Sequence, residues 1–568
     1  MIKNEMRKII EKAVKGVSSG DGPILVEIPK DIKNGDYSTN IALALSKKLG
    51  KNPVEIAKEI VGSIKKPEFL ENIEVAAPGF INFYLSKEVF VENVEGILKD
   101  KNFGKNPSSR TRGVHYGASN NLKNQKVIIE YTDPNILKEF HIGHLMSNAI
   151  GESLSRILEF SGAKIKRVCY QSDVGLGIAK AVFGKMRQPG LPWQSAYVLG
   201  TKMYDEDATA KEAITKLNKK IFERSDKAVN KVYDEGKKWS LAHFEKIYRK
   251  LGTKFDSFIF ESEVAPAGKK TVEKGLLKGI FETGEKGAIV FKGENYGLHT
   301  RVFINSEGLP TYEAKELALA KIKYDTYRYD QSVIITGNEV NEYFKVLMAA
   351  MSQIFPDLCK KTTHIGHGMM RLPEGKMSSR TGNIVTFEFL LREVEKLVAK
   401  KVADRDMPQQ EKEKMTENVA MGAIKYSILR QSIGSDIIYD FEKSISFEGD
   451  SGPYLQYSYA RANSVLRKAK QETVKASLKK VPVKIGQLEK MMWHFPEVIE
   501  KAGAESQPHI IVLYLTELAR EFNNYYAHNK IVDTTDEFSP YNVALTQAFS
   551  LIMKNGLWLL GIEAPEKM

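Results

Sequence analysis

The chain has 568 residues, with 84 Lys and Arg against 71 Asp and Glu, so its formal net charge is +13. Its 42% hydrophobic and 27% charged residues are typical of a globular protein and exclude a disordered or collagen-like chain. No apolar run reaches the roughly 18–20 residues of a membrane span. The first helix pattern also lacks the apolar core of a signal peptide. We therefore expect a cytoplasmic protein of about three or four domains, with no membrane partner.

Cysteine content and charge limit the possible partners. The chain contains only two cysteines, Cys169 and Cys359, and no CxxC motif, so we expect neither a disulfide framework nor a cysteine zinc site. The positive surplus is spread along the chain, which fits a large polyanion contacted by several domains. A merely basic enzyme would show the same charge, so the composition leaves both interpretations open.

Residues 1–112 predict an N-terminal α+β domain. Helical periodicity marks the first residues and again 53–64, while the alternating run 81–85 predicts a strand. The stretch 105–121 is rich in Ser, Asn, Gly and basic residues, which is typical of a linker. The predicted domain thus ends where this linker begins.

Residues 113–395 alternate short apolar runs with helical patterns, which predicts a parallel sheet. The predicted strands are 127–131, 165–170, 332–336 and 363–370. A helical pattern ended by Gly162 joins the first two strands, and another at 342–354 joins the last two. Such units require right-handed crossovers and parallel strands. The charged helical stretch at about 200–265 is interpreted as an insertion between the two halves.

The remaining residues, 396–568, show helical patterns and almost no strand signal. The fold class that follows is α/β, with a doubly wound parallel sheet of Rossmann type as its core. A small α+β domain precedes this core and an all-α domain follows it.

The segment 130–144 carries the strongest functional pattern. It leaves a buried strand and enters a helix, whose free N–H groups and dipole favour a phosphate group. His141 and His144 can face the same anion, and Gly143 leaves room for a flat base or sugar. Taken alone, such a helix start is more often an ordinary polar turn. The string His-Ile-Gly-His, however, resembles the first signature, HIGH, of class I aminoacyl-tRNA synthetases.

A second segment, 372–382, resembles the second signature of that class, KMSKS. Its residues are Lys376, Met377, Ser378, Ser379 and Arg380. A lysine and small hydroxyl groups on a flexible loop can close over a leaving pyrophosphate and neutralise its charge. Ser379 replaces the usual second lysine, and by resemblance Lys138 takes over its role.

The letters HIGH occur a second time, at His364-Ile365-Gly366-His367. No helix pattern follows this copy, so we expect it to lie on a strand. Without a helix N-terminus it cannot cradle phosphates, and we interpret it as structural.

Most of the chain resembles the arginyl-tRNA synthetase family. The similar blocks are 35–40, 77–83, 306–312, 452–461 and 564–568. The resemblance implies an arginine–tRNA ligase that makes arginyl-adenylate and pyrophosphate from L-arginine and ATP, then transfers arginine to the terminal ribose of tRNA(Arg). It also implies Mg²⁺ bound with ATP, no zinc, and a monomer. The first domain would contact the tRNA elbow, the second would catalyse, and the helical domain 396–568 would contact the stem and anticodon.

The predicted arginine site depends on Tyr312 and Glu316, which lie one helical turn apart. A guanidinium substrate requires a carboxylate with planar acceptor geometry and a polar ring beside it. By resemblance, this pair holds the guanidinium, while Glu130 and Asn135 hold the amino-acid head. An ordinary exposed pair is the alternative, and without the resemblance it is the commoner case.

The resemblance also implies the remaining roles. His141 and His144 would stabilise the phosphorus centre, and Lys138 and Lys376 the departing pyrophosphate. The predicted ATP-binding residues are His141, Gly143, His144, Lys376, Met377, Ser378 and Ser379. The predicted tRNA contacts are Asn82, Tyr526 and Met568.

Four residues depart from the family's pattern. Glu316 stands where the family usually has Asp, Val174 replaces a Trp, Val340 stands where many members carry Gln, and Ser379 replaces a Lys. Two rival functions remain: a class I synthetase for another amino acid, and a catalytically silent RNA-binding relative that kept the fold.

Overall fold

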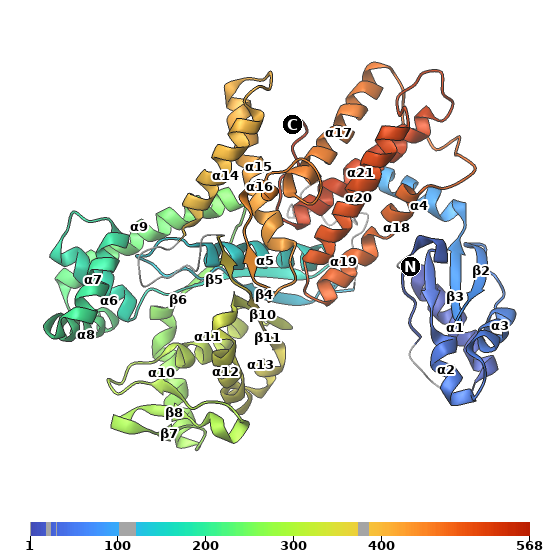
Figure 1. Ribbon diagram of the computed structural model, residues 1–568. Coiled ribbons are helices and arrows are strands. Elements are labelled where there is room, and N and C mark those ends of the chain that lie inside the picture. Colours follow the sequence, from blue (N-terminus) through green and yellow to red (C-terminus); the bar gives the residue numbers. More distant parts are fainter. Residues whose placement is uncertain (1, 19–23, 30, 101–120, 373–384) are drawn as a thin grey trace.

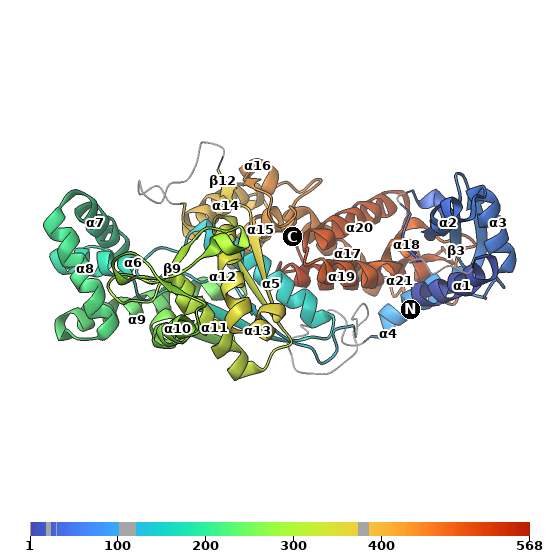
Figure 2. The same ribbon diagram turned by 90° about the horizontal axis from the view of Figure 1, so that it is seen from below.

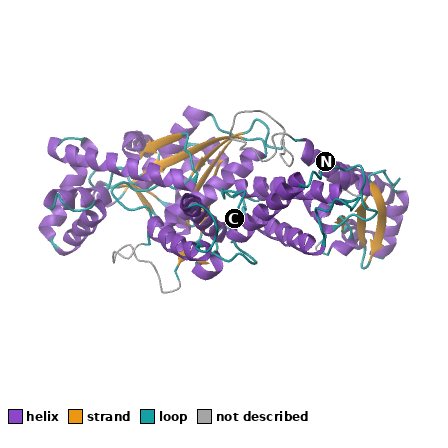
Figure 3. Cartoon of the chain, turned by 90° about the horizontal axis from the view of Figure 1, so that it is seen from above, coloured by secondary structure: helices purple, strands orange, loops and turns teal. Residues whose placement is uncertain are grey.

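The computed structural model describes residues 2–18, 24–29, 31–100, 121–372 and 385–568. The molecule is elongated, with helices α6–α9 at one end and the N-terminal domain at the other (Figures 1 and 2). The strands gather in the middle of the molecule and in a small sheet near the N-terminal end (Figure 3). In these ranges no helix combines the length and apolar character that a membrane span requires.

The N-terminal domain packs helices against a three-stranded antiparallel sheet with the order β1-β3-β2. Its elements are α1 (Ile2–Val17), β1 (Tyr37–Thr39), α2 (Ile41–Leu49), α3 (Pro53–Ser63), β2 (Leu70–Ala76), β3 (Phe80–Leu85) and α4 (Lys87–Lys99). The predicted helix at 53–64 and strand at 81–85 are thus present as α3 and β3. The predicted linker lies almost wholly outside the described residues.

A five-stranded parallel sheet with the order β11-β10-β4-β5-β6 forms the core of the next domain. Its strands are β4 (Lys126–Glu130), β5 (Lys164–Gln171), β6 (Ser257–Phe260), β10 (Gln331–Gly337) and β11 (Thr362–His367). The chain runs from β4 to β5 and β6 on one side and adds β10 and β11 on the other. The strand order therefore reverses beside β4, and ligands of such sheets bind outside the carboxyl ends of strands at this point. The predicted doubly wound fold is confirmed.

Helix α5 (Ile142–Phe160) follows β4 and is buried on nearly all sides. It contacts α14, α15, α19 and α21 as well as the sheet, so it has no broad solvent face. A helix in such a position carries apolar residues all round, and its polar residues must find partners inside the protein.

The predicted insertion at 200–265 differs from the structure at both ends. The inserted helices are α6 (Leu176–Arg187), α7 (Trp193–Glu206), α8 (Ala208–Glu223) and α9 (Lys227–Leu251), and β6 after them belongs to the central sheet. With four residues, β6 is too short to give a periodic signal.

The segment between β6 and β10 contains a small antiparallel sheet that the sequence patterns do not predict. It consists of β7 (Glu282–Thr283), β8 (Ile289–Phe291) and β9 (Arg301–Ile304), and α10 (Glu261–Leu277) and α11 (Tyr312–Tyr327) flank it. Helices α12 (Asn341–Ile354) and α13 (Pro356–Lys361) then lead to β11.

The C-terminal part is helical, as predicted, apart from one two-residue strand. Its elements are α14 (Phe387–Val402), α15 (Gln409–Leu429), β13 (Ile437–Ile438), α16 (Phe441–Ser444), α17 (Gly452–Gln471), α18 (Gln487–Trp493), α19 (Phe495–Ala504), α20 (His509–His528) and α21 (Ser539–Leu559). Strand β13 pairs in parallel with β12 (Met370–Arg371), which extends from the end of the central domain.

Candidate active site

The first signature forms the turn between β4 and α5, at the carboxyl end of the central sheet. His141 caps the N-terminus of α5, and its Nδ1 accepts the backbone N–H of Gly143 at 3.1 Å. His144 Nδ1 accepts the backbone N–H of His141 at 3.2 Å. The two imidazole rings stack with their centroids 3.6 Å apart. Together they close a reciprocal cap, a motif usually built from Ser or Thr with Glu or Gln.

Both histidines are neutral at pH 7 and carry their ring proton on Nε2. Each Nδ1 accepts a hydrogen bond, so in the neutral ring the proton must reside on the other nitrogen. Burial and the charge of Lys138 lower the pKa of His141 to about 4. Burial, together with His141 and Lys138, also lowers the pKa of His144. The turn therefore offers two uncharged N–H donors that the helix cap does not use.

Lys138 lies between this turn and the inserted helices. Its Nζ is 4.5 Å from the ring centre of Tyr197 on α7. A Cβ added at Gly177 on α6 would lie 3.4 Å from the same nitrogen. Lys138 is thus close enough to shift the pKa of both histidines, and an anion bound at the turn would meet its charge.

The predicted second-signature residues, Lys376, Met377, Ser378 and Ser379, lie outside the described residues. The chain that follows them runs beside the first signature: Ile142 N–H donates to Val385 O at 3.2 Å, and Phe387 N–H donates to Phe140 O at 2.9 Å. Backbone hydrogen bonds therefore join residues 385–387 to the first signature next to His141.

Acidic side chains gather behind the turn, where β4 ends. Glu130 is buried and pairs with Lys323 of α11 at 2.8 Å. Burial and the charge of Glu130 raise the pKa of Glu316 to about 8, although Lys323 opposes the shift. Burial and Glu130 also raise the pKa of Asp133, whose Oδ1 accepts the backbone N–H of Tyr170 at 2.6 Å. Glu316 is therefore not part of an ordinary exposed pair.

Glu261, at the start of α10, adds a fourth carboxylate to this group. It is buried and pairs with Lys315 of α11, and burial raises its pKa although Lys315 opposes the shift. The side chain of Ser172 bonds to both Glu261 and Tyr312. Tyr312 keeps 55% of its surface exposed, and its ring lies 4.4 Å from Lys315 Nζ.

Two buried tyrosine hydroxyls face the same group without a hydrogen-bond partner in the described part of the chain. They are Tyr170 Oη and Tyr343 Oη. Burial, followed by the charges of Glu261 and Glu316, raises the pKa of Tyr170, and Glu316 also contributes to the raised pKa of Tyr343. Since a buried hydroxyl without a partner costs free energy, these two atoms indicate a place for a polar ligand.

The carboxylates outnumber the lysines in this cluster. Glu130, Asp133, Glu261 and Glu316 lie with Lys315 and Lys323. Burial is the main cause of the raised pKa values of Asp133, Glu261 and Glu316. A ligand with a guanidinium and an ammonium group would supply two positive charges that favour the ionised carboxylates. Of these six residues, the sequence analysis identified only Glu130 and Glu316. The sequence signal that could have identified further members is a carboxylate at the end of a strand. Glu130 ends β4, and Glu261 directly follows β6.

Asn135 lies at the same edge of the sheet. It forms an isolated parallel bridge with Ser172, and the backbone N–H of Ile136 donates to Ser172 O at 3.0 Å. The structure thus brings Glu130, Asn135, Tyr312 and Glu316 to one place, next to the two histidines.

The departure at Val174 lies in the packed interior rather than in an open site. Val174 is buried, and its neighbour Asp173 accepts hydrogen bonds from Tyr233 at 2.9 Å and Lys237 at 2.7 Å. Asp173 also accepts two bonds from Ser262. Asp173 therefore connects α9 and α10 to the end of β5 through hydrogen bonds. Val340, another residue that departs from the family's pattern, lies in a short turn ahead of α12.

The second HIGH string lies on β11, so the prediction that it belongs to a strand is confirmed. His364 Nε2 bonds to Thr336 Oγ1 at 2.8 Å, and its ring stacks on Phe344 with centroids 3.7 Å apart. His367 Nδ1 donates to Gly368 O at 2.7 Å. Contacts within the protein account for both rings.

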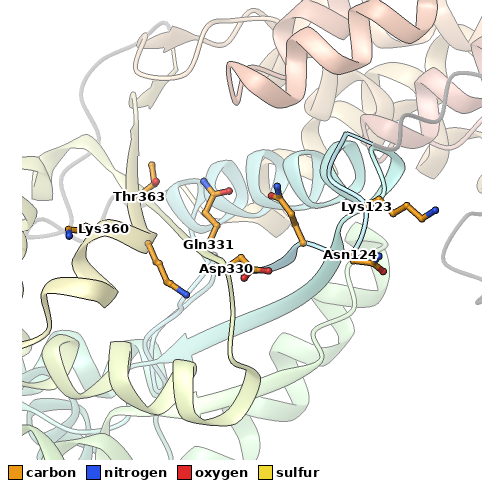
Figure 4. A pocket seen from close by; sticks show the side chains of 8 residues that line it. Lys123, Asn124, Asp330, Gln331, Lys360 and Thr363 are labelled. Atoms are coloured by element: carbon orange, nitrogen blue, oxygen red, sulfur yellow. The ribbon is translucent and has the colours of Figure 1, made fainter. Parts of the chain in front are cut away.

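A polar cavity of about 690 Å³ opens at the opposite edge of the sheet (Figure 4). Lys123, Asp330, Lys360 and Thr363 are among its lining residues, and they lie at the amino ends of β4, β10 and β11. None of the predicted site residues that the structure describes lines this cavity, so it belongs to a different part of the sheet.

Three family models together cover most of the chain. "tRNA synthetases class I (R), catalytic domain" matches residues 110–441, "DALR anticodon binding domain" matches 455–568, and "Arginyl tRNA synthetase N terminal domain" matches 2–85. The chain belongs to the arginyl-tRNA synthetase family. Members of this family charge tRNA with arginine at the expense of ATP, and the predicted ligase activity is confirmed.

Curated relatives and solved structures agree with this family. The chain is 30% identical to an arginine–tRNA ligase of Clostridium acetobutylicum over 100% of this chain and 99% of the relative. It is 32% identical to one of Limosilactobacillus reuteri, covering 96% and 95%. The fold is similar to Thermus thermophilus arginyl-tRNA synthetase, with 25% identity, full coverage of both chains and a TM-score of 0.75. The Plasmodium falciparum enzyme shares the fold at 22% identity, covering 100% and 99%, with a TM-score of 0.79.

The family model of the catalytic domain extends beyond residue 395, where the sequence analysis predicts the end of this domain. It ends at residue 441, so α14, α15 and β13 fall within it. The β12–β13 pairing explains this extent, because it joins the helices after the central sheet to the sheet domain itself.

The three predicted tRNA contacts differ in exposure. Asn82 on β3 is buried, and its Oδ1 accepts the hydroxyl of Ser38 at 2.8 Å. This side chain is therefore held within the N-terminal sheet, and its contact with tRNA stays a prediction. Tyr526 on α20 is 42% exposed, and Arg461 lies 5.2 Å from its ring centre. Met568 is half-buried against the helical core.

A cavity of about 390 Å³ lies close to Tyr526. Its lining includes Arg405, Tyr454, Tyr457, Arg461 and Asn523. The Arg461 guanidinium bonds to Asn523 and lies 4.7 Å from the Tyr457 ring centre. Arginine and exposed aromatic rings together form the kind of surface on which unpaired bases stack.

Proposed function

We propose that the site at the carboxyl end of the central sheet binds L-arginine and ATP and forms arginyl-adenylate. The cluster next to the first signature supports this proposal most strongly. It holds four carboxylates, two lysines and two tyrosine hydroxyls that have no hydrogen-bond partner among the described residues. A substrate with a positive charge at each end matches that surplus of carboxylates. A smaller neutral amino acid would leave the carboxylates without a counter-charge and the hydroxyls without partners.

In this proposal Tyr312 and Glu316 hold the guanidinium, while Glu130 and Asn135 hold the amino-acid head. Glu316 is one methylene longer than the Asp usual in the family, and its raised pKa reflects burial and the nearby charge of Glu130. The planar fork of a guanidinium can bond to a carboxylate and a phenol oxygen together.

The reaction begins when a carboxylate oxygen of arginine attacks the α-phosphorus of ATP, and the bond to the β-phosphate oxygen breaks. The Nε2–H donors of His141 and His144 bond to phosphate oxygens as their charge grows, and Gly143 lets the nucleotide approach the backbone. Lys138 and the second-signature residues Lys376, Met377, Ser378 and Ser379 would stabilise the departing pyrophosphate. No covalent enzyme intermediate is required, so positioning and electrostatics supply the acceleration.

Mg²⁺ would accompany the phosphates of ATP rather than occupy a protein site of its own. Within the described ranges no group of three or more His, Cys, Asp or Glu side chains is arranged for a metal ion. We likewise propose that the reaction uses no zinc.

In the second step a hydroxyl of the terminal ribose of tRNA(Arg) attacks the acyl carbon, and AMP leaves. Tyr526 and Met568 are the proposed contacts with the anticodon region, and the N-terminal domain would meet the tRNA elbow. We further propose that the protein acts as a monomer in the cytoplasm, where charged tRNA is consumed. The proposed domains are 1–112, 113–395 and 396–568, and the second carries the inserted helices α6–α9.

Aminoacylation of total tRNA with each of the 20 amino acids, labelled singly, tests the proposal. Charging with arginine alone is the expected result. Charging with another amino acid would refute the arginine site while keeping the class. Tight tRNA binding without charging would favour the silent RNA-binding relative.

Two substitutions of His144 distinguish the roles of its two ring nitrogens. His144→Asn keeps an acceptor near the Nδ1 position and removes the Nε2–H donor, whereas His144→Gln keeps a donor and loses the cap acceptor. If Nε2–H stabilises the transition state, we expect His144→Asn to lower kcat by about 10²–10³-fold with its melting temperature nearly unchanged. His144→Gln should lose stability but keep more activity. Equal losses of kcat in both variants would contradict the assigned role.

A further inference from the structure

Side chains in the middle of α5 bind carbonyl groups at the C-terminal ends of two other helices. Arg156 NH1 donates to Trp558 O of α21 at 2.8 Å, and Arg156 NH2 donates to Gly252 O, just after α9, at 3.0 Å. Arg156 also lies 5.0 Å from the centre of the Trp558 ring. Ser153 Oγ donates to Leu559 O at 2.9 Å. Helix α21 belongs to the region that matches the anticodon-binding model, so this helix domain bonds directly to the helix that carries the catalytic turn.

A buried lysine reinforces the same junction. Lys425 of α15 donates to Leu251 O at 2.7 Å and to Gly561 O at 2.6 Å. The carbonyl groups that end α9 and α21 are therefore held by side chains of α5 and α15. Helix ends are where such carbonyls need partners, and cations are favoured there.

From the junction, Arg156 leads inward to the loop after β4. Arg156 Nε donates to Glu152 Oε1 at 2.7 Å, and Tyr131 Oη donates to Glu152 Oε2 at 2.7 Å. Burial alone would raise the pKa of Glu152, but Arg156 and Arg167 lower it, so this carboxylate stays ionised between its partners. Tyr131 directly follows Glu130, one of the proposed arginine contacts.

The same loop is held by a second set of bonds from α5. Asn148 Nδ2 donates to Thr132 Oγ1 at 3.0 Å, and Thr253 Oγ1, just after α9, donates to Asn148 Oδ1 at 2.9 Å. Thr132 has a φ of 82°, a conformation that a β-branched residue adopts only when its surroundings hold it there. The loop carrying Glu130 and Asn135 thus depends on α5 for its shape.

We infer that Glu152 and Arg156 are positioning residues that couple the helical tRNA-binding domain to the arginine site. The inference rests on the proposed function, since it concerns how tRNA occupancy sets the affinity of that site. One guanidinium bonds to α21, to the end of α9 and to Glu152 at once, and Glu152 in turn holds Tyr131. Any displacement of the end of α21 must therefore break a buried charged bond or be passed on to the loop. A coupling of this kind is reciprocal, so arginine must change the affinity for tRNA by the same factor.

The coupling factor is the ratio of the dissociation constants of arginine measured without and with saturating tRNA(Arg) transcript, by calorimetry on the full chain. For the native chain we expect a factor of about 5 or more. Arg156→Gln and Tyr131→Phe cut the connection at opposite ends, and each should bring the factor close to 1. The double variant should show no further loss, because both changes remove the same connection.

Two further variants distinguish coupling from simple structural damage. Ser153→Ala removes a bond to the same end of α21 but leaves Glu152, Arg156 and Tyr131 in place, and it should keep the native factor. Arg156→Lys keeps a positive charge beside Glu152 and should restore part of the factor. Melting temperatures of all variants establish that they are folded.

Several results would overturn the inference. They are a factor of 1 in the native chain, a native factor in Tyr131→Phe, and an equal loss in Ser153→Ala. In each of these cases arginine still binds and is still charged to tRNA, so the proposed function stands. If the native chain binds no arginine, the proposed function fails and the inference fails with it.

Discussion

His141 and His144 combine two tasks in the same pair of rings. Their Nδ1 atoms hold the end of α5, and this fixes the ring proton on Nε2. A helix cap of Ser and Glu would satisfy the same N–H groups but offer only the Ser hydroxyl as a further donor, because an ionised Glu cannot donate. Because burial and Lys138 lower the pKa of His141 to about 4, its Nδ1 stays unprotonated and can accept the cap hydrogen bond throughout the physiological pH range.

The carboxyl of Glu316 titrates near neutrality, and this gives a prediction for arginine binding. Its pKa is raised to about 8, so at pH 7 the carboxyl of the free protein is mostly protonated. A guanidinium favours the carboxylate, so binding should release close to one proton. The affinity for arginine should therefore rise with pH up to about 8. Calorimetry at pH 7 in buffers of different ionisation enthalpy measures the released proton.

Glu316→Gln is the control for this proton. The variant should bind arginine more weakly and release almost none. If the native chain and the variant release equal numbers of protons, Glu316 does not receive the guanidinium.

Among the elements, the long regular ones could be predicted from the sequence and the short ones could not. Strands β4 and β10 contain continuous apolar runs that are buried, and so does the second half of β5. Helices α5 and α12 have clear helical periods, so the bounds of these elements differ from the predictions by only a few residues. Strands β6 to β9 have two to four residues each, too few for any period to show.

Helices α6 and α7 pack backbone against backbone. A Cβ at Gly184 would lie 2.0 Å from Ala196 O, and a Cβ at Gly200 would lie 1.9 Å from Lys180 O. Gly200→Ala must push the helices apart, so we expect a loss of about 1–3 kcal/mol in the free energy of unfolding. Urea unfolding measures it.

Gly62→Ala on α3 is the matched control, because nothing lies within 4 Å of its added Cβ. The better helix propensity of Ala should make this change neutral or slightly stabilising. Equal effects of the two substitutions would contradict the close contact between α6 and α7.

For the whole molecule, the N-terminal domain is held against the C-terminal helices by a small polar cluster. Tyr37 of β1 is fully buried, and its hydroxyl donates to Glu497 of α19 and accepts the indole N–H of Trp493 at 2.9 Å. Lys3 pairs with Glu497 at 3.2 Å, and Lys490 pairs with Asp36 at 2.9 Å. The two parts proposed to contact tRNA are thus fixed relative to each other.

Tyr37→Phe removes one hydroxyl and leaves Trp493 and Glu497 each short of a partner. Such a loss costs about 1–3 kcal/mol, which would loosen the docked domain. We expect the KM for tRNA to rise by up to about tenfold while the KM for arginine stays unchanged. Aminoacylation kinetics measure both constants.

Tyr84→Phe offers a matched control in the same domain. Among the described residues, its hydroxyl bonds only to Lys33 O and Glu74 Oε2, which belong to the N-terminal domain itself. A similar rise in the KM for tRNA in both variants would show that the effect of Tyr37→Phe does not come from loss of domain docking.

The candidate site could be predicted only where its residues are close together in the sequence. The pair His141 and His144 lies within one helical turn, and so does the pair Tyr312 and Glu316. Lys323 follows Glu130 by 193 residues, and the Glu261–Lys315 pair spans 54. Only the folded sheet brings these partners together, and no local pattern marks them.

The bond between Ser153 and Leu559 joins residues that are 406 positions apart. During synthesis, α5 is therefore made long before the carbonyl groups of α21 that hold it exist. Until the last residues have left the ribosome, the middle of this helix has buried polar groups without their final partners. The polar side chains in the middle of α5 thus gain these partners only after α21 has been made, late in synthesis.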